Sequence, residues 1–224
     1  SYLTGYLEII EKEKEEISKR FYNDYVRYVF GYDEKGNTVQ DVCLLSKVLT
    51  PSGRESDASL FAVVFMNRMI FIKFLEEKGV VPRKLLTDIL RRYKSSGSPG
   101  TFYETYLKPL FYEVFNKGKE SRILTVKANS FYSQIPYLNG GLFREIVARE
   151  RDYNIGNEGV ELVIDRLLEN YNFGSESGIN PDILGYIFEK TINFISGTGT
   201  NQQKMGGAYY TPDDVVEFII EETL

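Results

Sequence analysis

Histidine is absent from the 224-residue chain, and Cys43 is its only cysteine. Without histidine, the chain lacks the side chain that most often serves as a general base and as a metal ligand. A single cysteine excludes an intrachain disulfide framework and a cysteine-based zinc site, and this usage is typical of an intracellular protein. We therefore expect a cytoplasmic protein without a metal site.

An excess of positive charge is absent as well. The chain has 27 basic and 32 acidic side chains, which gives a net charge of -5 and an isoelectric point near 5.1. Proteins whose main task is to neutralise DNA phosphates are usually basic. The composition therefore gives no support to DNA binding, although an acidic protein can still carry a local basic face.

Long uninterrupted apolar runs are also missing. The most apolar stretch, residues 60–75, is interrupted by Asn67, Arg68 and Lys73, and it is too short for a membrane span. The first ten residues, SYLTGYLEII, lack the basic segment and the cleavage site of a signal peptide. We expect residues 60–75 to form a buried helix, and we expect no membrane partner.

The apolar content that is present, 42% hydrophobic with 14% aromatic, is sufficient for a folded core. Apolar residues recur at helical spacing, and the charges at 11–16 indicate a solvated helix face. The predicted helices cover residues 6–30, 57–78, 83–93, 102–116, 160–171 and 181–194. We predict a mainly α fold, a multi-helix bundle with a short irregular or strand-containing segment around 120–143, where residues 123–126 are the candidate strand.

The last nineteen residues, GGAYYTPDDVVEFIIEETL, contain the signals of a helix start after a flexible turn. Thr211 is a good N-cap, and Pro212 suits the first helical position. Asp213 and Asp214 follow where the helix dipole favours negative charge. Exposed amides at such a helix start are suited to hold a carboxylate or a phosphate.

The string Gly-Ala-Tyr-Tyr-Thr-Pro, followed by two acidic residues and Val-Val, resembles a known motif. It is similar to the motif that opens the S-adenosylmethionine-binding domain of gamma-class adenine-specific DNA methyltransferases. The resemblance implies that Tyr210, Thr211 and Pro212 contact the methionine end of the cofactor. It also implies that the rest of the catalytic domain would follow Leu224.

Two earlier segments strengthen this resemblance. Residues 135–143, IPYLNGGLF, resemble a segment that precedes the methyltransferase domain in type IIG restriction–modification enzymes and their phage-defence relatives. We interpret it as a structural turn that positions helices. Residues 180–192, NPDILGYIFEKTI, resemble the helix that leads into the Tyr-Thr-Pro motif in these enzymes. All three segments have the order and spacing of that family.

The resemblance implies an organisation for the whole chain. Residues 1–195 would be a helical connector domain, residues 196–207 a flexible Gly-rich linker, and residues 208–224 the start of the methyltransferase domain. In the parent enzyme, S-adenosylmethionine would methylate the exocyclic amine of a flipped adenine in DNA. The chain would supply one wall of the cofactor site and no catalytic residue, so alone it should be inactive and bind the cofactor weakly or not at all.

The implied partners are DNA, through the full-length enzyme, and the downstream methyltransferase domain. Type IIG enzymes also carry an upstream nuclease domain, which is not recognisable in this sequence.

Two other functions remain open at this point. A helical DNA-binding or target-recognition module would need a coherent basic face, and the only basic cluster is Lys84, Arg91, Arg92 and Lys94. We interpret that cluster as a solvated face near a helix C-terminus, where cations are favoured. A protein-interaction scaffold without a cofactor would use Thr211 only as a helix cap.

Overall fold

The computed structural model describes residues 2–33, 35–127, 129–138, 140–174, 178–179, 181 and 183–198. Most of this part of the chain is helical, which confirms the predicted mainly α fold. Its α-helices are α1 (Tyr2–Tyr25), α2 (Ala58–Glu77), α3 (Leu85–Ser96), α4 (Leu124–Lys127), α5 (Ser130–Ser133), α6 (Asn157–Val163) and α7 (Ile183–Thr198).

Wider π-helical turns extend or replace several of the α-helices. Val26–Phe30 continues α1, and Ile164–Leu168 continues α6. Tyr103–Leu107 and Leu110–Phe115 form most of the helix predicted at 102–116. Single 3-10 turns lie at Leu45–Lys47, Glu55–Asp57, Lys119–Ser121, Gly141–Phe143 and Glu150–Asp152.

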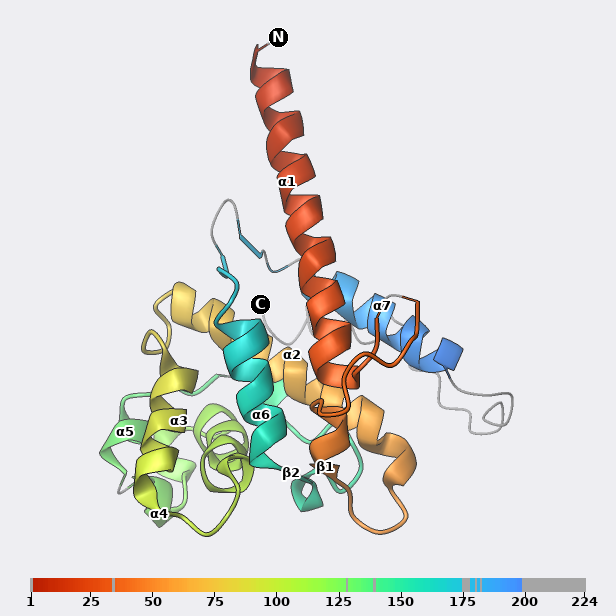
Figure 1. Cartoon of the computed structure of the whole chain (residues 1–224). Helices are drawn as coiled ribbons and strands as arrows, with labels where there is room; N and C mark the ends of the chain where they lie inside the picture. The colour runs from red at the N-terminus through yellow and green to blue at the C-terminus, as the bar shows by residue number, and fades with distance from the viewer. Residues whose placement is uncertain are drawn as a thin grey trace.

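Helix α2 is the centre of the fold, as its apolar surface on nearly all sides predicts. It crosses the molecule in Figure 1 and contacts α7, strand β1 (Val48–Leu49) and the Ile164–Leu168 turn. With the preceding turn it spans Glu55–Glu77, which is long and apolar enough to cross a membrane by length and composition. The judgement from residues 60–75 alone, that the stretch is too short, is therefore wrong for the whole helix, because the helix extends beyond those residues at both ends. In the structure, however, 72% of its most apolar window is buried inside the protein. The helix is therefore covered by the rest of the domain.

Helix α1 joins the body through its C-terminal half and stands clear of it at its N-terminal end (Figure 1). Phe21 and Tyr25 are fully buried. The Phe21 ring lies edge-on to Tyr171, with the ring centroids 4.9 Å apart, and edge-on to Phe173 at 5.9 Å. The charged residues at 12–16 are exposed or half-buried, as the predicted solvated face requires.

The strand predicted at residues 123–126 is wrong. The amides of Val126 and Lys127 both donate to the Ile123 carbonyl oxygen, at 3.1 and 3.0 Å, and α4 forms there instead. The β-branched residues favour a strand, but no strand among the described residues lies beside them, so the backbone pairs locally. Between 120 and 143 the described residues form short helical turns, so the segment is irregular without a strand.

The sheet lies elsewhere, between segments that the sequence did not pair. Strand β1 (Val48–Leu49) runs antiparallel to β2 (Asn154–Ile155), with Val48 opposite Ile155. The Gly156 amide extends the pairing by donating to the Lys47 carbonyl oxygen at 2.8 Å. At Gly159 the absence of a side chain is required, because a Cβ atom there would lie 2.9 Å from Lys47 Cβ.

Helix α7 confirms the helix predicted near 181–194 and continues to Thr198. Ile183 and Ile187 are buried in the core. The Tyr22 hydroxyl of α1 donates to the Lys190 carbonyl oxygen at 3.3 Å, and the Tyr22 and Tyr186 rings lie 5.9 Å apart. Because α7 ends at Thr198, it includes residues 196–198 of the predicted linker at 196–207. The other residues of that linker lie outside the described residues.

Replacing Phe21 with Ala should destabilise the domain by about 3–5 kcal/mol, because the cavity would open between α1 and the two rings that it contacts. Urea unfolding followed by circular dichroism would measure the loss. The Lys19→Ala variant of the same helix is the control, because it removes only the exposed ion pair to Glu15 and should cost at most about 1 kcal/mol. Equal midpoints for both variants would contradict the packing described here.

Candidate functional site

The residues that the sequence assigns to a cofactor site, Tyr210, Thr211 and Pro212, lie outside the described residues. The structure therefore does not test their role, which stays a prediction. The nearest described element is α7, whose last residue is Thr198. The buried polar contacts and the cleft that the structure does describe lie around the segment 135–143 and next to α2.

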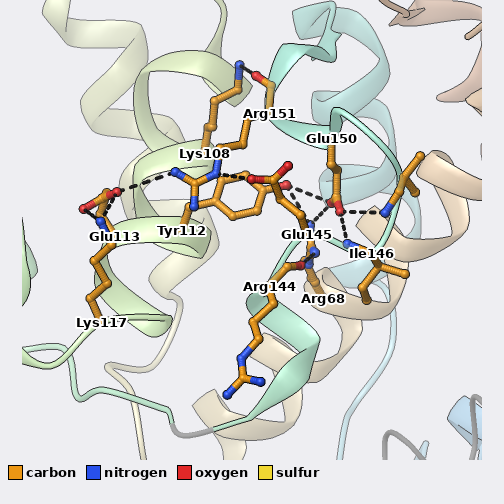
Figure 2. A network of polar contacts seen from close by, with 11 residues as sticks. Arg68, Lys108, Tyr112, Glu113, Lys117, Arg144, Glu145, Ile146, Glu150 and Arg151 are labelled. Carbon is orange, nitrogen blue, oxygen red and sulfur yellow. Dashed lines mark hydrogen bonds and ion pairs between the residues drawn. The ribbon is translucent and has the colours of Figure 1, made fainter.

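A buried polar cluster lies beside α2, and we call it the Arg68 network (Figure 2). Arg68 of α2 and Glu150 form an ion pair in which the side chains are 1% and 0% exposed. The Tyr112 hydroxyl accepts a hydrogen bond from Arg68 Nη1 at 3.2 Å and donates one to Glu150 Oε1 at 2.8 Å. Three segments distant in the sequence therefore meet at one buried charge pair.

The Arg68 network also fixes the end of the segment 135–143 and the backbone that follows it. Arg68 Nε donates to the Leu142 carbonyl oxygen at 2.7 Å, and Nη2 donates to that of Arg144 at 2.6 Å. Glu150 Oε2 accepts the amides of residues 146 and 147, at 2.6 and 3.1 Å. A guanidinium and a carboxylate thus hold both ends of one irregular stretch.

The electrostatics of the Arg68 network favour a structural role. Burial alone would lower the pKa of Arg68, but the Glu150 carboxylate and the Tyr112 phenol hold it above its usual value. Burial also raises the pKa of the Tyr112 phenol, which keeps the hydroxyl protonated as a donor. The two charged groups pair with each other and with backbone groups, and neither is accessible to a substrate. The network therefore stabilises the fold and offers no reactive group.

A second arginine, Arg122, holds the beginning of the same region. Its side chain is 5% exposed and donates only to backbone carbonyl oxygens. The acceptors are those of Val114 at 2.9 Å, Tyr132 and Ile135 at 3.0 Å, and Lys117 at 3.3 Å. Burial lowers the pKa of this guanidinium. A fork of donors is suited to gathering several carbonyl groups that have no secondary-structure partner.

Together the two arginines position the segment 135–143. Arg122 binds its first carbonyl group, Arg68 binds that of Leu142, and the Leu138 amide donates to the Phe115 carbonyl oxygen at 2.9 Å. Leu142 and Phe143 are buried in the core. The two arginines therefore fix the place of the segment on the core, and its role in positioning helices stays a prediction.

A surface cleft of about 240 Å³ lies where α2, α3 and the end of the α6 region meet. Lys73 Nζ at its wall donates to Glu76 at 2.9 Å and to Glu169 at 2.8 Å. Glu76 also accepts the backbone amides of Lys84 and Leu86, so it caps α3. Burial raises the pKa of the Glu76 carboxyl group. The lining has three basic side chains, Lys73, Arg83 and Lys84, and three acidic ones, Glu76, Glu77 and Glu169, so the cleft carries no excess of either charge.

Two of the four cations in the basic cluster of Lys84, Arg91, Arg92 and Lys94 are paired with carboxylates. Arg91 and Lys94 form ion pairs with acidic side chains at 3.0 and 2.8 Å. The Arg92 guanidinium lies over the Phe131 ring, 4.8 Å from its centroid. Within the part of the chain that the structure describes, no group of three or more His, Cys, Asp or Glu side chains could hold a metal ion.

Sequence analysis did not identify Arg68 and Glu150 as partners. A signal for Arg68 was present, because a charged residue inside a helix that is apolar on nearly all sides must be paired. The partner could not be named from the sequence, since Glu150 lies 82 residues away and looks like any charged loop residue.

These features lie within a recognisable protein family. Residues 53–189 match the family described as a domain of unknown function, DUF7814, and the chain belongs to that family. The matched range includes both Arg68 and Glu150. No solved structure matches the chain.

A relative comes from Methanocaldococcus jannaschii and bears the provisional name type II restriction enzyme and methyltransferase RM.MjaORFECS2P. It is 41% identical over 248 aligned residues that include the whole of this chain. The chain spans 21% of that relative's length.

Replacing Glu150 with Gln should destabilise the domain by about 3–5 kcal/mol, because it leaves the Arg68 charge buried without a counter-charge. Denaturant unfolding would measure the difference. Asp152→Asn is the matched control, since it removes the exposed ion pair to Arg149 in the same turn and should cost at most about 1 kcal/mol. Similar losses for the two variants would contradict the structural importance of the buried pair.

Proposed function

We propose that the chain is the helical region that precedes the catalytic core of an adenine-specific DNA methyltransferase in a restriction–modification or related phage-defence system. The observation that carries this proposal is the 41% identity to the M. jannaschii relative over the whole chain. A chain that matches about a fifth of such a protein would be one of its parts. DNA would be its partner through the full-length enzyme, in the cytoplasm.

The finer assignment concerns the cofactor. We place Tyr210, Thr211 and Pro212 in one wall of an S-adenosylmethionine site, at the methionine end of the cofactor. The Gly-Ala-Tyr-Tyr-Thr-Pro string supports this assignment, because it resembles the opening motif of the gamma-class enzymes. A helix start with free amides is also suited to a carboxylate. The catalytic residues would lie after Leu224, so the chain alone would not transfer methyl groups.

The packing of the chain supports the same proposal. The segment 135–143 is held on the core by Arg68 and Arg122, and α7 is docked on α1 and α2. A fixed helical body would give the methyltransferase domain a rigid base. The residues after 198 would lead from α7 into that domain.

The alternative of a DNA-binding or target-recognition module has less support. In the basic cluster that it would need, Arg91 and Lys94 are ion-paired and the Arg92 guanidinium lies over an aromatic ring. The alternative of an interaction scaffold without a cofactor is separated from our proposal by substitutions in the Tyr-Thr-Pro motif.

In the full-length enzyme, Tyr210→Ala should reduce methyl transfer to duplex DNA and weaken S-adenosylmethionine binding by at least about tenfold, the equivalent of one lost contact of about 1.4 kcal/mol. Titration calorimetry and transfer of a labelled methyl group would measure both quantities. Tyr209→Ala is the matched control, because it removes the neighbouring aromatic ring without an assigned cofactor contact.

Thr211→Ser adds a second control, because it keeps the hydroxyl group that caps the helix. We expect it to retain cofactor binding. Normal methyl transfer by a folded Tyr210→Ala enzyme would remove the cofactor-wall assignment and favour the scaffold. A natural polypeptide without a methyltransferase domain after Leu224 would overturn the proposed function as a whole.

A further inference from the structure

We propose that the surface cleft beside α2 binds a small zwitterion, a molecule of α-amino acid size that carries one carboxylate and one ammonium group. The lining comes from three segments that are distant in the sequence: α2, the residues just before α3 and the stretch 169–173. Pockets for small molecules start at about 300 Å³, so a volume of about 240 Å³ suits a ligand of roughly ten non-hydrogen atoms. The site is independent of the proposed function, because none of its residues belongs to the Tyr-Thr-Pro motif.

The charge balance of the cleft determines the kind of ligand. Its lining carries three cationic and three acidic side chains, which are Lys73, Arg83 and Lys84, and Glu76, Glu77 and Glu169. A lone anion would meet three carboxylates there, and a lone cation would meet three cationic groups, so an ion of a single sign is opposed. A ligand with one group of each sign and no net charge is attracted at both ends.

Lys73 brings a buried ammonium group to the cleft with a donor left over. The residue is 9% exposed, and its Nζ atom donates to Glu76 at 2.9 Å and to Glu169 at 2.8 Å. An ammonium group has three N–H donors, so one remains beyond the two contacts described for it. A carboxylate on the ligand would accept this donor in a charge-assisted hydrogen bond, which is stronger than a bond between neutral groups.

The backbone of Lys84 has a conformation that glycine adopts more easily. Its φ of 59° and ψ of 28° lie in the left-handed region, where a Cβ atom is unfavourable. The Lys84 amide donates to Glu76 at 3.2 Å, and a glycine amide would make the same bond. The Lys84 side chain lines the cleft, and among the described residues no hydrogen bond or ion pair engages it. Residues with such strain cluster at ligand sites, and here the lysine adds an ammonium group.

The acidic wall of the cleft offers partners for the ammonium group of the ligand. Glu77 is exposed, and within the described part of the chain its carboxylate has no hydrogen bond or ion pair. Gly174 leaves room for the Glu77 side chain, because a Cβ atom there would lie 3.1 Å from Glu77 Cγ. Glu169 binds Lys73 through Oε1, so its Oε2 remains for a ligand. We assign the ammonium group to these two carboxylates.

Arg83 and Asn172 complete the rim. Neither side chain makes a hydrogen bond or an ion pair among the described residues. The backbone at Asn172 is held, since its carbonyl oxygen accepts the Ile179 amide at 2.8 Å. A guanidinium binds a carboxylate through two parallel hydrogen bonds, so Arg83 joins Lys84 as a partner of the ligand carboxylate. A wall that is ordered in advance lowers the entropic cost of binding.

Titration calorimetry on the 224-residue chain, with each of the twenty protein amino acids at about 10 mM, would test the site. At least one should bind with a millimolar or lower dissociation constant and raise the unfolding midpoint as its concentration rises. The carboxamide of that amino acid lacks the negative charge, and its N-acetyl derivative lacks the positive charge. Each should bind at least about tenfold more weakly than the parent molecule.

Lys84→Gly distinguishes ligand binding from a structural role. Glycine keeps the left-handed backbone and the bond to Glu76, so the variant should unfold at about the same denaturant concentration as the unaltered chain. It should nevertheless bind the amino acid at least about tenfold more weakly, and so should Arg83→Ala. The matched control is Lys78→Ala, which removes an exposed cation at the end of α2 outside the cleft lining and should leave the affinity unchanged.

Four results would overturn the zwitterion site. The first is that no amino acid binds at about 10 mM, and the second is that Lys84→Gly and Arg83→Ala both bind as tightly as the unaltered chain. A carboxamide that binds as well as its parent would show that the carboxylate is not recognised. An N-acetyl derivative that binds as well would identify an anion site instead. None of these results concerns methyl transfer, so the proposed function is tested separately.

Discussion

The ion pair between Arg68 and Glu150 is the constraint on which the irregular half of this domain depends. Helix α2 supplies the positive charge from the centre of the core, and the turn at Glu150–Asp152 supplies the negative charge. Breaking such a pair is costly because the remaining charge stays buried. The pair also binds backbone groups from residues 142 to 147, so a change at either side chain would release a stretch that has no regular secondary structure of its own.

Much of the helical fold could be predicted from the sequence, because the helix signals are local. The apolar spacing of α1, α2 and α6 identifies those elements without any tertiary information. The strand propensity of residues 123–126 gave a wrong prediction, because no strand among the described residues lies beside these β-branched residues. The pairing of Val48 with Ile155 was missed for the opposite reason, since two-residue strands carry no periodic pattern and their partners lie far apart in the chain.

The candidate site, too, could be predicted from the sequence only in part. The Tyr-Thr-Pro motif was found through resemblance, and it lies outside the described residues, so its role rests on the sequence alone. The segment 135–143 was also found through resemblance, and the structure adds the physical reason for its shape. Arg68 and Arg122 bind carbonyl groups of this segment. Some partners of these arginines lie far away in the sequence, and others are backbone atoms, which no sequence pattern marks. No inspection of one sequence could have assigned those bonds.

The sequence separation within the Arg68 network has a consequence for the order of folding. Arg68 binds a carbonyl group 74 residues away and a carboxylate 82 residues away, so long loops must close before these bonds form. The helices on either side can form from many local contacts, whereas residues 141–147 have only one 3-10 turn and two short-range bonds to Glu150 among the contacts described for them. This stretch should therefore become ordered late, after α2 has been covered by its neighbours. A nascent chain would hold its core helices in place before the turn that resembles the methyltransferase-preceding segment acquires its final shape.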